Sequence, residues 1–374
     1  MRNNTALGIL ALAAACLSSV APASAIPLFA QRYRLQCAAC HTVLPELNEF
    51  GLSFRDRGYR LPAEKHGTSG VAIRYQMEYE KSPPPGARRY TPGGVLLSNA
   101  DIGAISAFVH YNFGAGGGPG ALYLGYLATY NAHTASLYRA GLFELPLAQS
   151  PGQRLDDLAG YGYYGTHAGL NDLPLGSPRW GLEASRRVGA VRASVTVAFA
   201  DYQGSAYGGK PVQTGETSRQ SSPEIGLFAR VPVTRNVTIG GEALAGTRAI
   251  TPAGRAQFGD AYRRYGLLGS ARMGRLEFQA EQFWGSDSNA DGFATAAGSS
   301  GGYARLKYYP TPHAYLGVRY DAAAAPFAVR DIVYYAAMHV TPHARLLVQQ
   351  VQNIGGGGQF GAAITVGFPW PSNR

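Results

Sequence analysis

The sequence predicts an all-β fold, an antiparallel outer-membrane barrel of about 16 strands that follows a short α-helical segment. Three observations predict it. From about residue 71, segments of about ten residues alternate between apolar and polar side chains, as strands with one lipid-facing side do. Connections of alternating length separate these segments. Beyond the N-terminus, no apolar run reaches the roughly 20 residues that a transmembrane helix needs.

The first 25 residues have the pattern of a secretory signal peptide. Arg2 supplies the positive start, 7–20 is apolar, and Ala23-Ser24-Ala25 provides small residues for cleavage. Cys16 follows three alanines and allows a lipoprotein reading, but the Ala-x-Ala site is better placed. The sequence therefore predicts an exported chain that keeps two of its three cysteines.

Those two cysteines lie in the run Cys37-Ala38-Ala39-Cys40-His41. In an exported chain, C-x-x-C-H is the attachment motif of a c-type haem, whose vinyl groups add the two thiols while the histidine ligates the iron. A zinc site would need two further Cys or His ligands nearby, and a thioredoxin-type pair would follow a βαβ pattern. Neither is present. We therefore predict one covalent haem c, bound by Cys37 and Cys40 with His41 as proximal ligand.

Residues 26–68 are predicted to form this monohaem segment. Leu47, Phe50 and Phe54 recur at helical spacing, and Gly58 is a candidate C-terminal cap. So short a segment rarely folds without help, so we expect it to rest on the remainder of the chain.

The second axial ligand of the haem iron is not determined by the pattern. His66 is the nearest downstream histidine, and Met77 lies in the first predicted strand. A sixth position that is open, or filled from outside, is the third alternative. No catalytic residue is separable from the haem.

Residues 69–374 are predicted to form the barrel. In 191–199, apolar residues alternate with Arg192, Ser194 and Thr196, and 275–284 and 343–350 repeat the pattern. Short turns are expected at 189–190, 234–236, 273–274, 310–312 and 341–343. Longer loops are expected at 203–221, 248–260, 286–301 and 322–329. The expected strands are 71–80, 99–113, 120–131, 135–145, 160–168, 179–188, 190–202, 222–233, 236–247, 261–273, 275–285, 302–309, 313–321, 330–340, 343–353 and 358–368.

Two other classes of protein fit the sequence less well. A soluble periplasmic sandwich or propeller would show buried apolar runs rather than many alternating segments. Nucleic-acid binding is one reading of a net charge of +10. The basic residues never form a run of five, and no binding motif accompanies them, so we predict no nucleic-acid partner.

The N-terminal motifs resemble those of a known family. The family pattern is matched by Pro27-Leu28-Phe29-Ala30, by the haem motif, by Pro45-Glu46-Leu47-Asn48-x-Phe50-Gly51-x-x-Phe54 and by Gly58-Tyr59. In these motifs the chain resembles the fused monohaem cytochrome–porins of the outer membrane. This family includes the iron oxidases of Fe(II)-oxidising bacteria. The remainder of the chain matches in architecture alone.

The resemblance implies a haem segment at the periplasmic side of an outer-membrane barrel, or inside it, in a Gram-negative bacterium. It implies single-electron transfer from extracellular Fe(II) through the haem to a periplasmic cytochrome or copper protein, and thus an Fe(II) oxidase activity. Two alternatives are an electron conduit for another donor or acceptor, and a diffusion porin with a structural haem plug. Outer-membrane lipid is the remaining partner.

Several polar residues of the predicted strands are expected to line the lumen: Arg275, Glu277, Glu281, Arg319 and Asp321. Carboxylates attract Fe(II), which accepts oxygen ligands. Lumen charges more often pair with one another and with water, and we expect that here.

Overall fold

The computed structural model describes residues 28–33, 35, 37–43, 46–61, 69–81, 89–113, 120–147, 157–161, 170–171, 175–201, 217–324, 329–341 and 344–369. The predicted signal peptide, Cys16 and His66 lie outside these ranges. Among the described residues, no helix is both long enough and apolar enough to span a bilayer.

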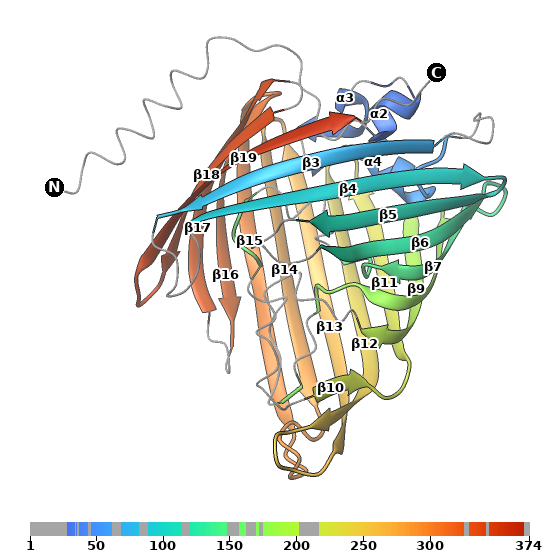
Figure 1. Ribbon diagram of the computed structural model, residues 1–374, viewed down its shortest axis with the longest axis vertical. Helices are drawn as coiled ribbons and strands as arrows, with labels where there is room; N and C mark the ends of the chain where they lie inside the picture. Colours follow the sequence, from blue (N-terminus) through green and yellow to red (C-terminus); the bar gives the residue numbers. More distant parts are fainter. Residues whose placement is uncertain are drawn as a thin grey trace.

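A closed antiparallel barrel dominates the molecule (Figure 1). Strand β19 pairs with β3 and β9 pairs with β11, which closes the sheet without an edge. The short β10 and the longer β11 both pair with β12, so they form one interrupted strand, and the described barrel has 16 strands. The bounds are β3 Ser69–Glu80, β4 Tyr90–Ile102, β5 Ile105–Phe113, β6 Ala121–Asn131, β7 Ser136–Phe143, β8 Arg179–Val188, β9 Val191–Asp201, β10 Thr217–Gln220, β11 Glu224–Thr234, β12 Val237–Thr251, β13 Phe258–Met273, β14 Leu276–Asp287, β15 Ala297–Thr311, β16 Ala314–Ala323, β17 Val329–Thr341, β18 Ala344–Asn353 and β19 Gly358–Pro369.

The two faces of the wall follow the predicted alternation. On β9, Val191, Val195 and Phe199 are exposed on the outer face, while Ser194 and Thr196 are buried on the inner face. The same division recurs on other strands because successive side chains of a strand point to opposite faces. A closed barrel with an apolar outer face satisfies its backbone hydrogen bonds internally, as a lipid environment requires.

The connections differ between the two ends of the barrel. Two-residue turns join β4 to β5, β8 to β9, β11 to β12 and β13 to β14, and the first strand starts at the same end. Longer connections lie at the opposite end, including those after β7 and β9. In outer-membrane barrels the short turns face the periplasm, and we call this the short-turn end.

Two of the predicted strands were wrong. The expected strand 99–113 is broken by a turn at Gly103, and β4 extends back to Tyr90 across a stretch without a predicted strand. No strand lies between β7 and β8, because these two strands pair directly with each other. Residues 160 and 161 of the expected strand 160–168 are outside any strand, and its other residues lie outside the described ranges. The two errors offset each other, so the predicted number of strands is nevertheless confirmed.

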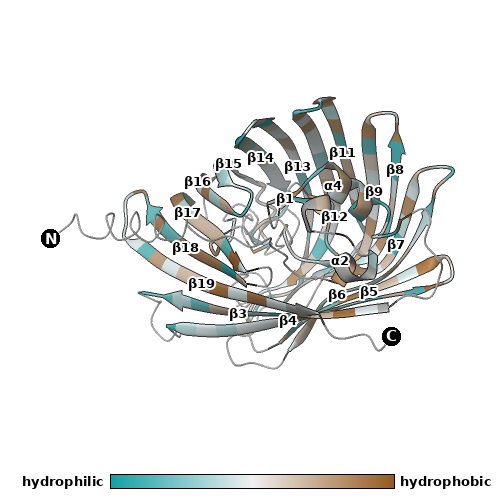
Figure 2. Ribbon diagram, turned by 90° about the horizontal axis from the view of Figure 1, so that it is seen from above, coloured by the Kyte–Doolittle hydropathy of each residue, from teal (hydrophilic) through white to brown (hydrophobic). Residues whose placement is uncertain are grey.

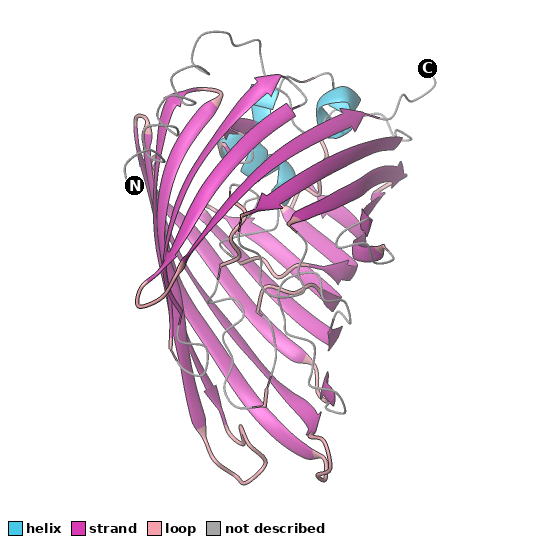
Figure 3. Cartoon of the chain, turned by 60° about the vertical axis from the view of Figure 1, so that its left-hand side comes forward, coloured by secondary structure: helices cyan, strands magenta, loops and turns pink. Residues whose placement is uncertain are grey.

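The N-terminal segment lies inside the ring of strands at the short-turn end (Figures 2 and 3). It consists of α2 (Leu28–Tyr33), α3 (Cys37–Cys40), β1 (His41–Val43), β2 (Glu46–Leu47) and α4 (Glu49–Asp56). Strands β1 and β2 pair only with each other, so the segment is not part of the barrel wall. The expected short helical segment before the barrel is therefore confirmed.

Candidate haem site and barrel lumen

The motif cysteines begin and end the single helical turn α3, and His41 follows at the start of β1. Residues three apart in a helix share a face, with Cβ atoms about 5–6 Å apart. Cys40 is half-buried. The local backbone therefore suits two thiols that react with one ligand while the next residue reaches its metal.

Asn48 holds this turn in place. Its backbone N–H donates to the Cys40 carbonyl at 2.9 Å, and its side-chain amide donates to the Ala39 carbonyl at 3.0 Å. Its side-chain oxygen accepts a 2.9 Å hydrogen bond from the Gly51 N–H, which caps α4. One residue thus joins the haem motif to the helix that follows it, a role that the sequence pattern did not reveal.

Gly51 allows α4 to pack directly against the haem motif. A Cβ atom at this position would lie 2.0 Å from the Cys40 carbonyl oxygen, which is far inside van der Waals contact. Glycine is therefore required where helix and motif meet. Gly58 plays a different role. It follows the helix with φ +67°, and the Tyr59 N–H donates to the Phe54 carbonyl, so the predicted C-terminal cap is confirmed.

An aromatic cluster fixes the segment to the barrel. Phe29 stacks on Tyr59 at 4.5 Å between ring centroids, and Tyr59 stacks on Phe108 of β5 at 5.8 Å. Phe108 in turn stacks on Tyr126 of β6 at 5.3 Å. Burial raises the pKa of the Tyr59 phenol. The stack is thus continuous from the N-terminal segment, which contains the predicted haem motif, to the inner wall.

Leu28 and the contacts of two charged side chains, Arg60 and Asp56, complete the docking. Leu28 is 2% exposed and packs in a cluster with Ala72 and other inward-facing residues of the wall. Arg60 donates to the carbonyls of Gly103 and Ala104, each at 2.7 Å, in the β4–β5 turn. Asp56 forms an ion pair with Arg192 at the start of β9. These contacts place the segment at the short-turn end.

Met77, one candidate for the distal ligand, faces away from this segment. It lies on β3 opposite Ile364, which is exposed on the outer surface, and it shares its face with exposed Tyr75. The inward face of β3 carries Ala72 and the other even-numbered residues. This orientation leaves Met77 out of any ligand set that we propose.

A second segment enters the lumen from the long connection between β7 and β8. We call its described parts, residues 144–147, 157–161, 170–171 and 175–178, the inner segment. Arg319 pairs with Asp157, donates to the Ala159 and Gly160 carbonyls, and lies 3.8 Å from the Tyr161 ring centre. These contacts hold residues 160 and 161, the described start of the predicted fifth strand, inside the lumen rather than in the wall.

Further contacts extend along the inner segment. Gln349 accepts hydrogen bonds from the backbone of residues 158 and 159, and Arg230 donates to the carbonyls of residues 146 and 147. Asn171 donates to the carboxylates of Asp260 and Asp287 at 2.8 and 2.6 Å. Arginines, amides and carboxylates of the wall thus hold the inner segment across much of the lumen.

Most of the predicted lumen charges lie as expected and are paired. Arg319 also pairs with Asp321 at 2.8 Å, and Glu277 pairs with Arg305 at 3.1 Å. Glu281 is buried on the inner face. Arg275 does not line the lumen, because the turn after β13 includes it and its side chain donates to the Pro310 carbonyl in solvent.

The donor set of the motif fits a c-type haem. Two cysteines three residues apart and an adjacent histidine lie on one locally ordered turn, and α4 presents Phe50, 41% exposed, beside it. Among the described side chains, no three His, Cys, Asp or Glu residues gather as a metal-ion site.

The barrel is similar to solved outer-membrane porins. An anion-selective porin from Comamonas acidovorans matches 82% of this chain and all of its own, at 11% identity and a TM-score of 0.56. Salmonella typhi OmpF, solved with daunomycin, matches 81% of this chain and 97% of its own, at 9% identity and a TM-score of 0.57. OmpT of Vibrio cholerae without loop L8 matches 81% of this chain and all of its own, at 10% identity and 0.53. At such identities the likeness concerns the fold.

No protein-family model and no curated protein sequence matches the chain. Closure, strand number, apolar exterior and turn asymmetry together identify an outer-membrane barrel with the porin fold. The predicted location in the outer membrane of a Gram-negative bacterium is confirmed, and so is contact with membrane lipid.

Proposed function

We propose that this barrel is an outer-membrane cytochrome–porin that transfers single electrons from extracellular Fe(II) through one haem c to a periplasmic carrier. The observation that carries the proposal is the position of the Cys37–His41 turn, which lies in a segment docked inside the short-turn end of the barrel. A cofactor held there lies between the lumen and the periplasm.

The barrel matters because the outer membrane is an electrical insulator about 30 Å thick in its hydrocarbon core. A closed barrel is a structure that can hold polar groups and irregular backbone at that depth. An electron donor that forms an insoluble oxide is best oxidised at the cell surface, and the long-loop end provides that side.

The chain's own residues would hold and shield the cofactor. Cys37 and Cys40 would bind the porphyrin, and His41 would ligate the iron. Asn48 fixes the turn that carries them, and the exposed ring of Phe50 offers an apolar surface. When bound, the haem supplies a one-electron carrier whose potential depends on its axial ligands, burial and hydrogen bonds.

No residue of the lumen is assigned to the electron donor, Fe(II). Arg319 pairs with Asp321, and Arg305 pairs with Glu277. Because each charge is neutralised by its partner, we assign none of these four residues to Fe(II). A periplasmic cytochrome or copper protein is the proposed acceptor because the haem segment lies at the short-turn end.

Two measurements on the purified full-length protein test the proposal. The pyridine haemochrome spectrum should show one covalent haem per chain, and the C37A/C40A variant should show none. Stopped-flow mixing of the oxidised protein with Fe(II) should then reduce the haem within catalytic times. If dithionite reduces the haem but Fe(II) does not, the donor assignment fails while the cofactor assignment stands.

A second candidate function is a diffusion porin in which the haem segment is a structural plug. The porin fold of the barrel favours it. Single-channel conductance in planar bilayers separates the two functions. The electron-transfer proposal expects little ion flow, since electron transfer needs no aqueous path through the lumen, whereas a diffusion porin would conduct steadily past its plug.

A further inference from the structure

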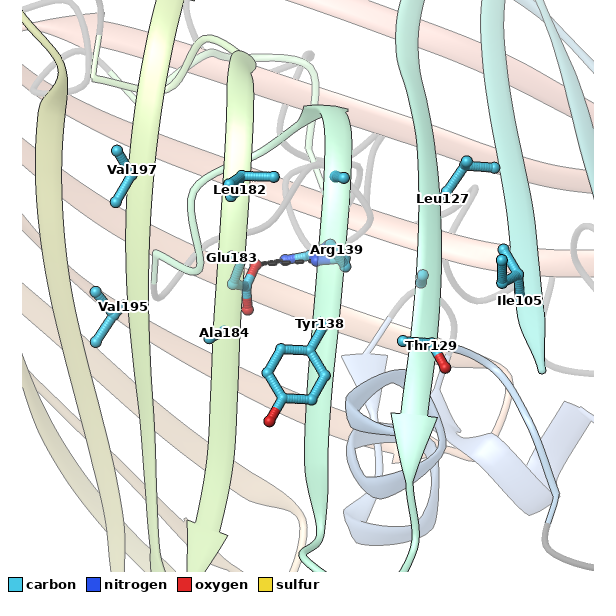
Figure 4. A pocket seen from close by; sticks show the side chains of 12 residues that line it. Ile105, Leu127, Thr129, Tyr138, Arg139, Leu182, Glu183, Ala184, Val195 and Val197 are labelled. Carbon is cyan, nitrogen blue, oxygen red and sulfur yellow. Dashed lines mark hydrogen bonds and ion pairs between the residues drawn. The ribbon is translucent and has the colours of Figure 1, made fainter.

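The outer face of the barrel carries an apolar groove of about 390 Å³ across β5 to β9 (Figure 4). Five of its large lining side chains are between 44% and 52% exposed: Ile105, Leu127, Tyr138, Leu182 and Val195. Ala140 and Ala184 lie among them. Because each side chain is a single methyl group, the backbone of β7 and β8 is little covered at these two positions. Small residues between large ones create the hollow.

Arg139 and Glu183 also line the groove and form its floor. Arg139 donates from Nε to the Glu183 carboxylate at 2.9 Å on the inner face, and Figure 4 shows this pair on the far side of the strands. Glu183 is 2% exposed. A buried ion pair thus lies beneath the exposed apolar side chains of the groove.

Two polar groups lie at the short-turn rim of the groove. Arg186 is the next outward-facing position on β8 after Ala184, it is exposed, and it pairs with no acidic group in the described part of the chain. The hydroxyl of Tyr138 points toward the same end (Figure 4). A cation and a hydrogen-bond donor thus face outward, one row beyond an apolar hollow.

The depth of Arg186 indicates what lies opposite it. An outward arginine costs about 2–4 kcal/mol at the bilayer midplane but about 0–1 kcal/mol near an interface. Strand β8 ends only two residues later, at Val188, so Arg186 lies at the interface of the periplasmic leaflet. Phosphate groups of lipid headgroups are found at that level.

We infer that this groove binds one phospholipid of the periplasmic leaflet, with an acyl chain on Ala140 and Ala184 and the headgroup phosphate on Arg186 and the Tyr138 hydroxyl. The apolar hollow matches a hydrocarbon chain, and the rim matches an anion. A second copy of the barrel is a poorer occupant, because it would bury the unpaired guanidinium of Arg186.

Native mass spectrometry of the full-length protein, delipidated in a mild detergent and titrated with dioleoylphosphatidylglycerol, tests the inference. The wild type should retain one lipid. Arg186→Gln should weaken binding about tenfold, since a charge-assisted hydrogen bond is lost. Ala184→Trp should abolish binding by filling the hollow. Arg263→Gln, an exposed outward arginine of β13, is the matched control and should bind as the wild type does.

Unchanged lipid binding by both groove variants would overturn the inference. It would also fail if Ala184→Trp kept its lipid but dissociated an oligomer, since the groove would then be an interface between copies. Arg186→Gln alters only an exposed side chain, so it remains informative even if the tryptophan variant does not fold. None of these outcomes depends on haem or on electron transfer.

Discussion

Two segments occupy the lumen, and they are held there by different forces. The haem segment rests on the wall mainly through Leu28 and the stacked rings of Tyr59 and Phe108. The inner segment is held by arginines, amides and carboxylates, with Arg319 at its centre. Apolar docking with few ionic contacts leaves the haem segment a separable unit, whereas the inner segment is tied into the charge network of the wall.

Among the variants that test this difference, Gly51→Ala should have the largest effect. The new methyl group would meet the Cys40 carbonyl oxygen at 2.0 Å, so α4 must separate from the haem motif. We expect covalent haem per chain to fall by an order of magnitude while the barrel still shows heat-modifiable migration on gels. Gly269→Ala, where a Cβ meets nothing within 4 Å, is the control. Normal haem content in Gly51→Ala would contradict the packing described here.

Arg319→Ala should act on the other segment. Removal of one partner from a buried charge network costs about 3–5 kcal/mol, because Asp157 and Asp321 would be left without their cation. We expect a lower urea midpoint and higher single-channel conductance, with haem content unchanged. Arg263→Ala on the outer surface should change neither. Loss of haem in Arg319→Ala would show that the two segments are coupled.

Asp56→Asn should have a much smaller effect. The pair with Arg192 is partly exposed, with side chains 30% and 22% accessible, and such pairs contribute about 0–1 kcal/mol. Limited proteolysis of the haem segment should become slightly faster in the variant, and high salt should remove the difference from wild type. A large effect that persists in salt would mean that this ion pair is central to docking.

The smallest expected effect concerns pH. Burial raises the pKa of Tyr59 above its ordinary value of 10.0, so the docked state favours the neutral phenol. Its contribution is complete below pH 10 and is lost as the pH rises through the raised value, because the undocked phenol ionises first. Tyr59→Phe should therefore lack one part of the alkaline increase in proteolysis of the haem segment. Identical alkaline profiles would contradict the burial of this phenol.

Most features that the sequence predicts depend on residues that are close together in the chain. The haem motif, the Gly58 cap and the two faces of the strands depend on near neighbours in the chain. The first part of β4 was missed because Pro92, Gly93 and Gly94 weaken the strand pattern. Pairing with β3 and β5, and the ring of Phe113 over Gly94, stabilise the strand there.

The remaining errors have non-local causes. Tyr161 belongs to an alternating stretch, but its partners Arg305 and Arg319 lie more than 140 residues away and draw it into the lumen. The role of Asn48 was likewise hidden, since an asparagine before a helix shows a cap but not the Ala39 carbonyl that it also binds. Contacts between residues distant in the chain determine the position of Tyr161 and the second role of Asn48, which local sequence patterns do not predict.

Stopped-flow spectroscopy of the purified holoprotein mixed with Fe(II) tests the central claim most directly. The account predicts a haem that is bound to Cys37 and Cys40 and is reduced by Fe(II) within catalytic times, with no signal in the C37A/C40A variant. A purified barrel that carries no covalent haem, or one whose haem responds to dithionite but never to Fe(II), would contradict it.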